Sequence, residues 1–234
     1  MTIYDQTTAR FDFRAGPIFA NVVLADEINR TTPRTQSALL EAMSDGHVSI
    51  DDRTHVLDPP FVVIATQNPT EHYGTYPLPE SQLDRFLLRI RIGYPAHEDE
   101  REVLKRAGEG DAIETLKAVA DPTQVLKLQA RAAQVTIHDK LIDYAMAVVA
   151  ETRRAPGVAL GVSTRGALGW TRAAQAAALV AGRDYVVPDD LKGLAIAALA
   201  HRIQLAGDVS ASGRGREEAE RVLGDLLERV PVPG

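Results

Sequence analysis

Two neighbouring acidic residues, Asp26 and Glu27, directly follow the apolar run Val22–Ala25. A short run that is apolar throughout is typical of a buried strand in a parallel sheet. Open α/β sheets bind their ligands at the carboxyl ends of the strands, which is where these two carboxylates are expected. Acidic residues at the end of a strand are also common in ordinary loops, so this hexapeptide alone leaves both interpretations open.

A second apolar run, residues 61–66, is followed closely by the amide residue Asn68. If the two runs form neighbouring strands, Asn68 lies beside Asp26 and Glu27 and could orient a water molecule there. Two carboxylates after an apolar strand form a Walker B pattern, in which the Asp helps to bind Mg²⁺ and the Glu polarises the attacking water. Asn-Pro after a strand is more often only a turn, so the rest of the chain must decide between a functional amide and an ordinary turn.

Two arginines occupy positions from which they could act on a phosphate. Arg85 is predicted late in a short helix that opens at Leu78-Pro79, and Arg165 follows Ser163-Thr164 at the start of a long helix. A guanidinium in either place could stabilise charge on a transferring phosphoryl group. Most arginines on helices are solvated surface residues, and this is the competing interpretation of each.

The elements that must position these residues follow the alternating pattern of an α/β layered fold up to about residue 94. Buried strands are predicted at residues 21–25 and 61–66. A third strand is predicted at residues 87–92, where apolar and polar residues alternate, and it is placed nearer an edge of the sheet.

One helix and two hairpins are predicted between and beside these strands. The helix begins at Thr32-Pro33, a capping residue followed by proline at the first helical position, and ends before Gly46. The hairpins, at residues 4–13 and 47–57, interrupt the layered pattern as insertions.

After residue 94 the sequence is almost purely helical, and we predict two domains, residues 1–94 and residues 95–234. Apolar residues recur at helical spacing in the second domain. They are Ile137, Leu141, Ala145 and Val148, and then Leu191, Leu194, Ala198 and Leu199.

Taken together, the order of these segments resembles the MoxR family of AAA+ ATPases. The resemblance covers nearly the whole chain and is most specific in the first domain. It is carried by residues 16–21, 24–30, 35–43, 64–69, 74–80, 82–87, 93–95 and, more loosely, 161–165. The fold class that it implies is α/β, an incomplete AAA+ P-loop-type parallel sheet with β-hairpin inserts, followed by an all-helical lid domain.

The resemblance implies a role for each candidate residue. Asp26 and Glu27 would be the Walker B pair, with Asp26 binding Mg²⁺. Asn68 would be sensor 1 and Arg165 would be sensor 2, both contacting ATP. Arg85 would be the arginine finger, which acts on the nucleotide of a neighbouring subunit.

The resemblance also implies partners. ATP would lie between the subunits of a ring, commonly a hexamer, and the two hairpins would be the helix-2 insert and the pre-sensor hairpin of this clade. Relatives are thought to act as chaperone-like ATPases that remodel or mature client proteins, often with a von Willebrand factor A domain partner.

The chain departs from the family in one respect, because no Gly-x-x-x-x-Gly-Lys-[Ser/Thr] motif occurs in it. None of its five lysines follows a glycine. This phosphate-binding loop supplies the backbone N–H groups and the lysine that contact the phosphates. We therefore expect Met1 to be an internal start in a longer reading frame and the chain alone to bind ATP poorly. The alternative is a non-catalytic module for ring assembly or partner binding.

The composition of the chain argues against several other classes of function. The net charge of −6 and pI near 5.5 argue against a nucleic-acid partner and weaken a DNA-remodelling role. The absence of cysteine excludes disulfides and thiolate metal sites, and a cytoplasmic location is expected. No apolar run approaches the length of a membrane span. A metal hydrolase using Asp26 and Glu27 with His47, His55 or His72 lacks the spacing of helical metal ligands.

Overall fold

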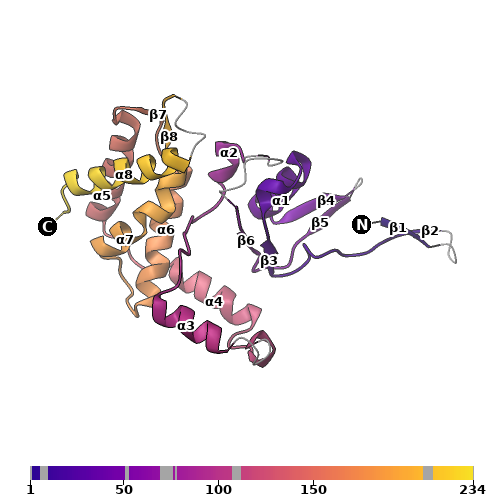
Figure 1. The fold of residues 1–234 in the computed structure, drawn as a ribbon. Helices are drawn as coiled ribbons and strands as arrows, with labels where there is room; N and C mark the ends of the chain where they lie inside the picture. Colours follow the sequence, from indigo (N-terminus) through magenta and orange to yellow (C-terminus); the bar gives the residue numbers. More distant parts are fainter. Residues whose placement is uncertain are drawn as a thin grey trace.

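The computed structural model describes residues 2–5, 10–50, 53–68, 76, 78–106, 112–207 and 213–233. The chain forms an α/β part near the N-terminus and a helical part that contains the C-terminus, as Figure 1 shows. A hairpin of β1 (Thr2–Asp5) and β2 (Arg10–Phe13) extends away from both. Among the described residues, no helix combines the length and the apolar character needed to cross a membrane.

The parallel sheet of the α/β part consists of β3 (Val22–Ala25) and β6 (Val62–Ala65). The two strands are hydrogen-bonded neighbours, which the sequence left open, and Ala25 pairs with Ala65 at their carboxyl ends. The prediction that both strands are buried throughout was wrong for one face of the sheet, because the described part of the chain leaves that face uncovered. Its side chains are Val22, Leu24, Val62 and Ile64, which are 59%, 67%, 41% and 53% exposed.

The third predicted strand, at residues 87–92, does not form. A strand is stable only when a neighbouring strand satisfies its backbone N–H and C=O groups. Here the Arg89 N–H donates instead to the Ala197 carbonyl oxygen in the helical part, at 2.8 Å. The alternating apolar side chains remain in solvent, with Ile90 75% and Ile92 93% exposed.

The helix α1 (Pro33–Asp45) begins and ends where its capping signals predicted. The Thr32 hydroxyl accepts a hydrogen bond from the Thr35 N–H, and Gly46 ends the helix in the left-handed conformation at φ 67°. One turn inside α1, the buried Gln36 side chain donates to the carbonyl oxygens of Ile28 and Tyr76, at 3.1 and 3.0 Å. The helix is thereby joined to the segment that follows β3.

Both predicted hairpins form. The first is the β1–β2 hairpin, and the second pairs β4 (His47–Ile50) with β5 (Arg53–Val56). Their turns lie outside the described residues. The Phe13 ring stacks on the His55 ring with centroids 4.0 Å apart, so the two hairpins contact each other.

The helical part is built around one hydrophobic core. Trp170 is fully buried at its centre with Val148, Leu191 and Leu223, and the Trp170 indole N–H donates to the Leu191 carbonyl oxygen at 2.8 Å. The helices are α3 (His97–Lys105), α4 (Pro122–Ala132), α5 (Asp139–Arg154), α6 (Thr164–Val180), α7 (Pro188–Leu199) and α8 (Gly213–Arg229).

The structure adds one feature to this part that the sequence did not predict, a short antiparallel pair of β7 (Val158–Leu160) and β8 (Gln204–Leu205). Strands of three and two residues are too short to show a period-2 pattern. They form because packing of the helices brings the two segments together.

Candidate functional site

The candidate site lies at the carboxyl ends of β3 and β6, where Asp26 and Glu27 face the residues that follow Ala65. The parallel register continues past the strands, because the Thr66 N–H donates to the Ala25 carbonyl oxygen at 3.0 Å and the Ile28 N–H donates to the Thr66 carbonyl oxygen at 3.0 Å. The two polar segments are therefore joined at one edge of the sheet, which is where ligands of open α/β sheets bind.

Thr66 links the two acidic residues directly. Its hydroxyl donates a short hydrogen bond to the Asp26 carboxylate and accepts the Glu27 backbone N–H at 2.8 Å. The apolar pattern of residues 61–66 predicts Thr66 only as the last residue of a strand. A hydroxyl at the strand end nearest an acidic pair was the signal that could have identified it.

We expect Thr66→Val to lower the free energy of unfolding by about 1–2 kcal/mol, because it keeps the β-branched shape and removes two hydrogen bonds. Urea unfolding followed by circular dichroism measures the loss. The matched control is Thr54→Val, an exposed position on β5. Equal stability of the two variants would contradict a structural role for the Thr66 hydroxyl.

Glu27 has a backbone conformation that is unusual for a residue with a side chain. Its φ of 48° and ψ of 51° lie in the left-handed region, which costs a non-glycine residue about 1–2 kcal/mol. The Thr66 hydroxyl and the Arg30 N–H, which donates to the Glu27 carbonyl oxygen at 2.8 Å, maintain this conformation. Backbone strain of this kind is concentrated at functional sites.

The Glu27 carboxylate is paired with Arg30 at 3.0 Å, within the short 3₁₀ turn Ile28–Arg30. Both side chains are partly exposed, at 36% for Glu27 and 46% for Arg30. Water therefore reaches the pair, and its contribution to stability is small. In this state the carboxylate is directed toward Arg30.

Asn68 lies at the same edge as Asp26 and Glu27. The Asn29 side-chain amide donates to the Asn68 carbonyl oxygen at 3.3 Å, which joins the segment after β6 to the segment after β3. The Asn68 side chain is half-buried. The expectation that Asn68 lies beside the acidic pair required the two strands to be neighbours, and they are.

Arg85 lies in the turn after α2 (Glu80–Leu83), two residues beyond the end of the short helix in which it was predicted. Its guanidinium donates to the Leu40 carbonyl oxygen at 3.1 Å and to the Ser44 hydroxyl. Arg85 is thus anchored on α1, although the residue as a whole remains exposed.

Arg165 lies in the first turn of α6, as predicted, and is exposed. The Ser163 hydroxyl caps this helix by accepting the Gly166 N–H at 3.0 Å. Arg165 is close enough to the buried Arg202 for its charge to help to lower the Arg202 pKa, although burial is the larger cause. The Ser163 hydroxyl lies 3.4 Å from the Asp84 carboxylate, so the first turn of α6, which contains Arg165, meets residues 84–86.

The residue pattern does not predict the ion pair that Arg202 and Asp84 form at this contact. The Arg202 guanidinium donates to the Asp84 carboxylate at 2.8 Å and to the backbone carbonyl oxygens of Asp84 and Phe86 at 3.1 and 2.8 Å. The Arg202 side chain is only 4% exposed. The two charged residues lie 118 positions apart, so no local pattern connects them.

His201, next to this ion pair, is buried and contacts the Phe86 carbonyl oxygen through Nε2 at 3.1 Å. Burial, helped by the positive charge of Arg202, lowers the pKa of His201 to about 4 from its ordinary value of 6.5. The imidazole is neutral in the folded protein at pH 7.

The His201 pKa predicts a loss of stability in mild acid. The unfolded chain takes up a proton near pH 6.5 and the folded protein only near pH 4, so stability falls as the pH falls between these values. We expect His201 to contribute about 2 kcal/mol of the loss between pH 7 and pH 5. Urea unfolding of His201→Gln should show a shallower pH dependence by this amount. The exposed His97→Gln is the control, and equal pH dependence in the two variants would contradict the prediction.

Two of the histidines considered as metal ligands make other contacts in the structure. His47 contacts the Asp45 carbonyl oxygen at 3.2 Å, His55 stacks on Phe13, and His72 lies outside the described residues. Within the described part of the chain, no group of three or more His, Asp or Glu side chains is arranged to bind a metal ion.

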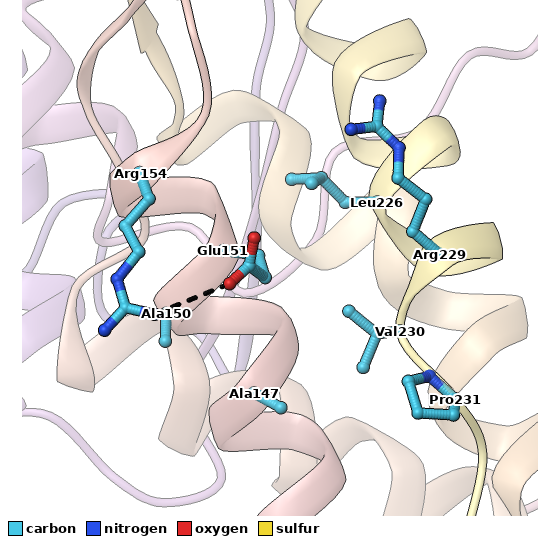
Figure 2. Close-up of a pocket in the computed structure, with 8 residues that line it drawn as sticks. All are labelled: Ala147, Ala150, Glu151, Arg154, Leu226, Arg229, Val230 and Pro231. Carbon is cyan, nitrogen blue, oxygen red and sulfur yellow. Dashed lines mark ion pairs between the residues drawn. The ribbon is translucent and has the colours of Figure 1, made fainter.

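A separate hollow of about 350 Å³ lies between α5 and the end of α8, within the helical part. Figure 2 shows Arg154 and Arg229 on opposite sides of it, with Glu151 between them. Glu151 and Arg154 form an exposed ion pair at 3.6 Å. The hollow is lined by Ala147, Ala150, Glu151, Arg154, Leu226, Arg229, Val230 and Pro231, and none of the candidate residues lines it.

Two family models match the chain in the order of its two parts. Residues 1–88 match the model of the ATPase family associated with various cellular activities (AAA), and residues 150–224 match the AAA lid domain. The fold and these matches define an AAA+ ATPase.

Individual relatives narrow the class. The chain is 46% identical to the uncharacterised protein YeaC of Bacillus subtilis over all of its length and 72% of that protein. It is 43% identical to the chaperone MoxR1 of Mycobacterium tuberculosis, over 99% of the chain and 62% of that protein. It is 31% identical to the protein MoxR of Paracoccus denitrificans, over 91% of the chain and 67% of that protein. A solved protein from Cytophaga hutchinsonii, proposed to be an ATPase, superposes with a TM-score of 0.88 at 37% identity, over the whole chain and 73% of that protein. The chain belongs to the MoxR family of AAA+ ATPases.

Proposed function

We propose that this chain provides the hydrolytic and sensing residues of a MoxR-type ATPase, which couples ATP binding and hydrolysis to chaperone-like remodelling or maturation of client proteins. The observation that carries the proposal is the hydrogen-bonded cluster at the carboxyl ends of β3 and β6. There Thr66 bridges Asp26 and Glu27, and Asn68 lies at the same edge. Membership of an AAA+ family supports nucleotide binding.

Within this proposal Asp26 binds the Mg²⁺ that accompanies the nucleotide. The Asp26 side chain is exposed, and its hydrogen bond from Thr66 orients the carboxylate. Carboxylate oxygens are preferred Mg²⁺ ligands, and a site with one protein carboxylate suits an ion that keeps several waters and binds phosphate oxygens. When bound, Mg²⁺ neutralises charge on the phosphates.

Glu27 is the proposed general base and Asn68 orients the attacking water. The Glu27 carboxylate is paired with Arg30 at 3.0 Å, so it must turn away from that arginine to accept a proton from the water. The Glu27 side chain is 36% exposed, so water can reach its carboxylate.

The two candidate arginines act from opposite sides in this proposal. Arg165 contacts the nucleotide bound by its own chain, and Arg85 contacts the nucleotide of a neighbouring subunit in a ring, proposed to be a hexamer. Guanidinium groups suit this role because they are always charged and bind phosphate oxygens in a bidentate manner.

The phosphate-binding loop is proposed to come from polypeptide outside the 234 residues, which contain no Gly-x-x-x-x-Gly-Lys-[Ser/Thr] motif. The test compares ATP turnover by the 234-residue chain with turnover by the same chain fused at its N-terminus to the loop-bearing segment of a relative. We expect turnover only in the fusion. Saturable ATP hydrolysis by the chain alone, or none in a folded fusion, would contradict the proposal.

A second candidate, a non-catalytic module that assembles rings or binds partners, is favoured by the same missing motif. A von Willebrand factor A domain protein is a proposed partner in either case. The fusion experiment separates the two candidates, because the non-catalytic module would assemble without turnover.

A further inference from the structure

At the contact between the helical part and residues 84–86, one guanidinium donates three hydrogen bonds across it. The buried Arg202 uses its three nitrogens to bind the Asp84 carboxylate, two carbonyl oxygens of residues 84 and 86, and the Ala198 carbonyl oxygen of its own part. Arg202 therefore joins α7, on which Ala198 lies, to the segment that follows α2.

Asp84 also reaches the first turn of α6. Both of its carboxylate oxygens lie 3.4 Å from the Ser163 hydroxyl, which caps that helix. Arg165 is the second residue of α6, and Arg85 is the residue after Asp84. The two candidate arginines are therefore attached to opposite sides of one contact.

Helix α6 is shaped to admit the Arg202 side chain. A Cβ atom at Gly166 would lie 2.7 Å from Arg202 Cδ, and one at Gly169 would lie 3.3 Å from the Leu87 side chain and 3.7 Å from Arg202 Nη2. Real Cβ atoms do not approach as closely as the first of these distances. The close approach of α6 to the Arg202 side chain thus depends on glycine at position 166.

We propose that Asp84 and Arg202 are positioning residues that set the orientation of the helical part, and with it Arg165, relative to α1 and Arg85. Arg85 is anchored on α1 through Leu40 and Ser44, so a change at Asp84 alters the placement of Arg165 with respect to a fixed Arg85. The link between this contact and a nucleotide site rests on the proposed function. The effect of the contact on the orientation of the two parts is independent of that function.

The test measures the distance between the two parts in the 234-residue chain without nucleotide. The chain has no cysteine, so spin labels at Ser37→Cys on α1 and Arg172→Cys on α6, both exposed positions, report only these sites. Double electron–electron resonance should give one narrow distance distribution in the parent chain. Asp84→Asn, which keeps the size of the side chain and removes its charge, should broaden or shift that distribution.

Arg202→Ala should lose the narrow distribution as well, but it also leaves buried carbonyl oxygens without a donor and can unfold the chain. Asp84→Asn is therefore the decisive variant. The matched control is Asp190→Asn, which breaks the ion pair between Asp190 and Arg183 inside the helical part, at 2.6 Å. This control weakens the helical part without touching the contact with residues 84–86.

Broadening with Asp84→Asn and an unchanged distribution with Asp190→Asn would support the proposal. An unchanged distribution with Asp84→Asn, or equal broadening with both variants, would overturn it. The distance measurement contains no ATP, so its result does not depend on whether the chain takes part in ATP hydrolysis. Each of the two proposals can therefore be contradicted without the other.

Discussion

Glu27→Gln should lower ATP turnover at saturating ATP by about 10²–10⁴-fold in the protein completed with a phosphate-binding loop. The amide keeps the shape of the carboxylate and its place at the end of β3, but it cannot accept a proton from the attacking water. ATP affinity should remain, because Glu27 is proposed to act on water and not on the phosphates. Turnover and nucleotide binding are measured on the same preparation.

The control for this variant is Glu98→Gln, the same chemical change at an exposed position in the first turn of α3. Glu98→Gln should retain full turnover. If Glu27→Gln hydrolyses ATP as fast as the parent protein, another residue is the base, and the assignment of the acidic pair is wrong. If it loses ATP binding together with turnover, the role of Glu27 is structural.

Trp170→Ala should lower the free energy of unfolding by about 3–5 kcal/mol. The indole is fully buried at the centre of the helical part, so the truncation leaves a large cavity among Val148, Leu191 and Leu223. It also removes the donor to the Leu191 carbonyl oxygen, which becomes a buried acceptor without a partner. The variant lacks the protein's single tryptophan, so its unfolding in urea cannot be followed by tryptophan fluorescence and is measured by circular dichroism.

Two further variants divide this effect into its causes. Trp170→Phe removes the hydrogen bond and a smaller volume, so its loss should be clearly less than that of Trp170→Ala. Leu168→Ala, in the same helix but 51% exposed, should change stability by less than about 0.5 kcal/mol. A loss at Leu168 comparable with that at Trp170 would contradict a core centred on the indole.

The helix α1 shows which parts of the fold could be predicted from local sequence. Thr32, Pro33 and Gly46 each act within one turn of the helix end, so its limits agree with the prediction. The apolar runs likewise predicted that β3 and β6 are strands, whereas the sequence left their pairing open and the structure shows it.

The segment at residues 87–92 shows why the rest could not be predicted. Its alternating pattern satisfies the sequence requirement for a strand, but strand formation also requires a partner with free backbone groups. In the described part of the chain its backbone contacts α7, on which Ala197 lies, and the apolar side chains stay exposed. Pattern alone does not reveal whether that partner is present.

The candidate site divides in the same way. The sequence by itself determined the family and the acidic pair at a strand end, because a strand delivers the residues that follow it to one edge of the sheet whatever surrounds it. Only the tertiary structure decided that Thr66 bridges Asp26 and Glu27 and that Arg202 binds Asp84. Contacts between residues 40 or 118 positions apart depend on how strands pair and helices pack, and both depend on the whole chain.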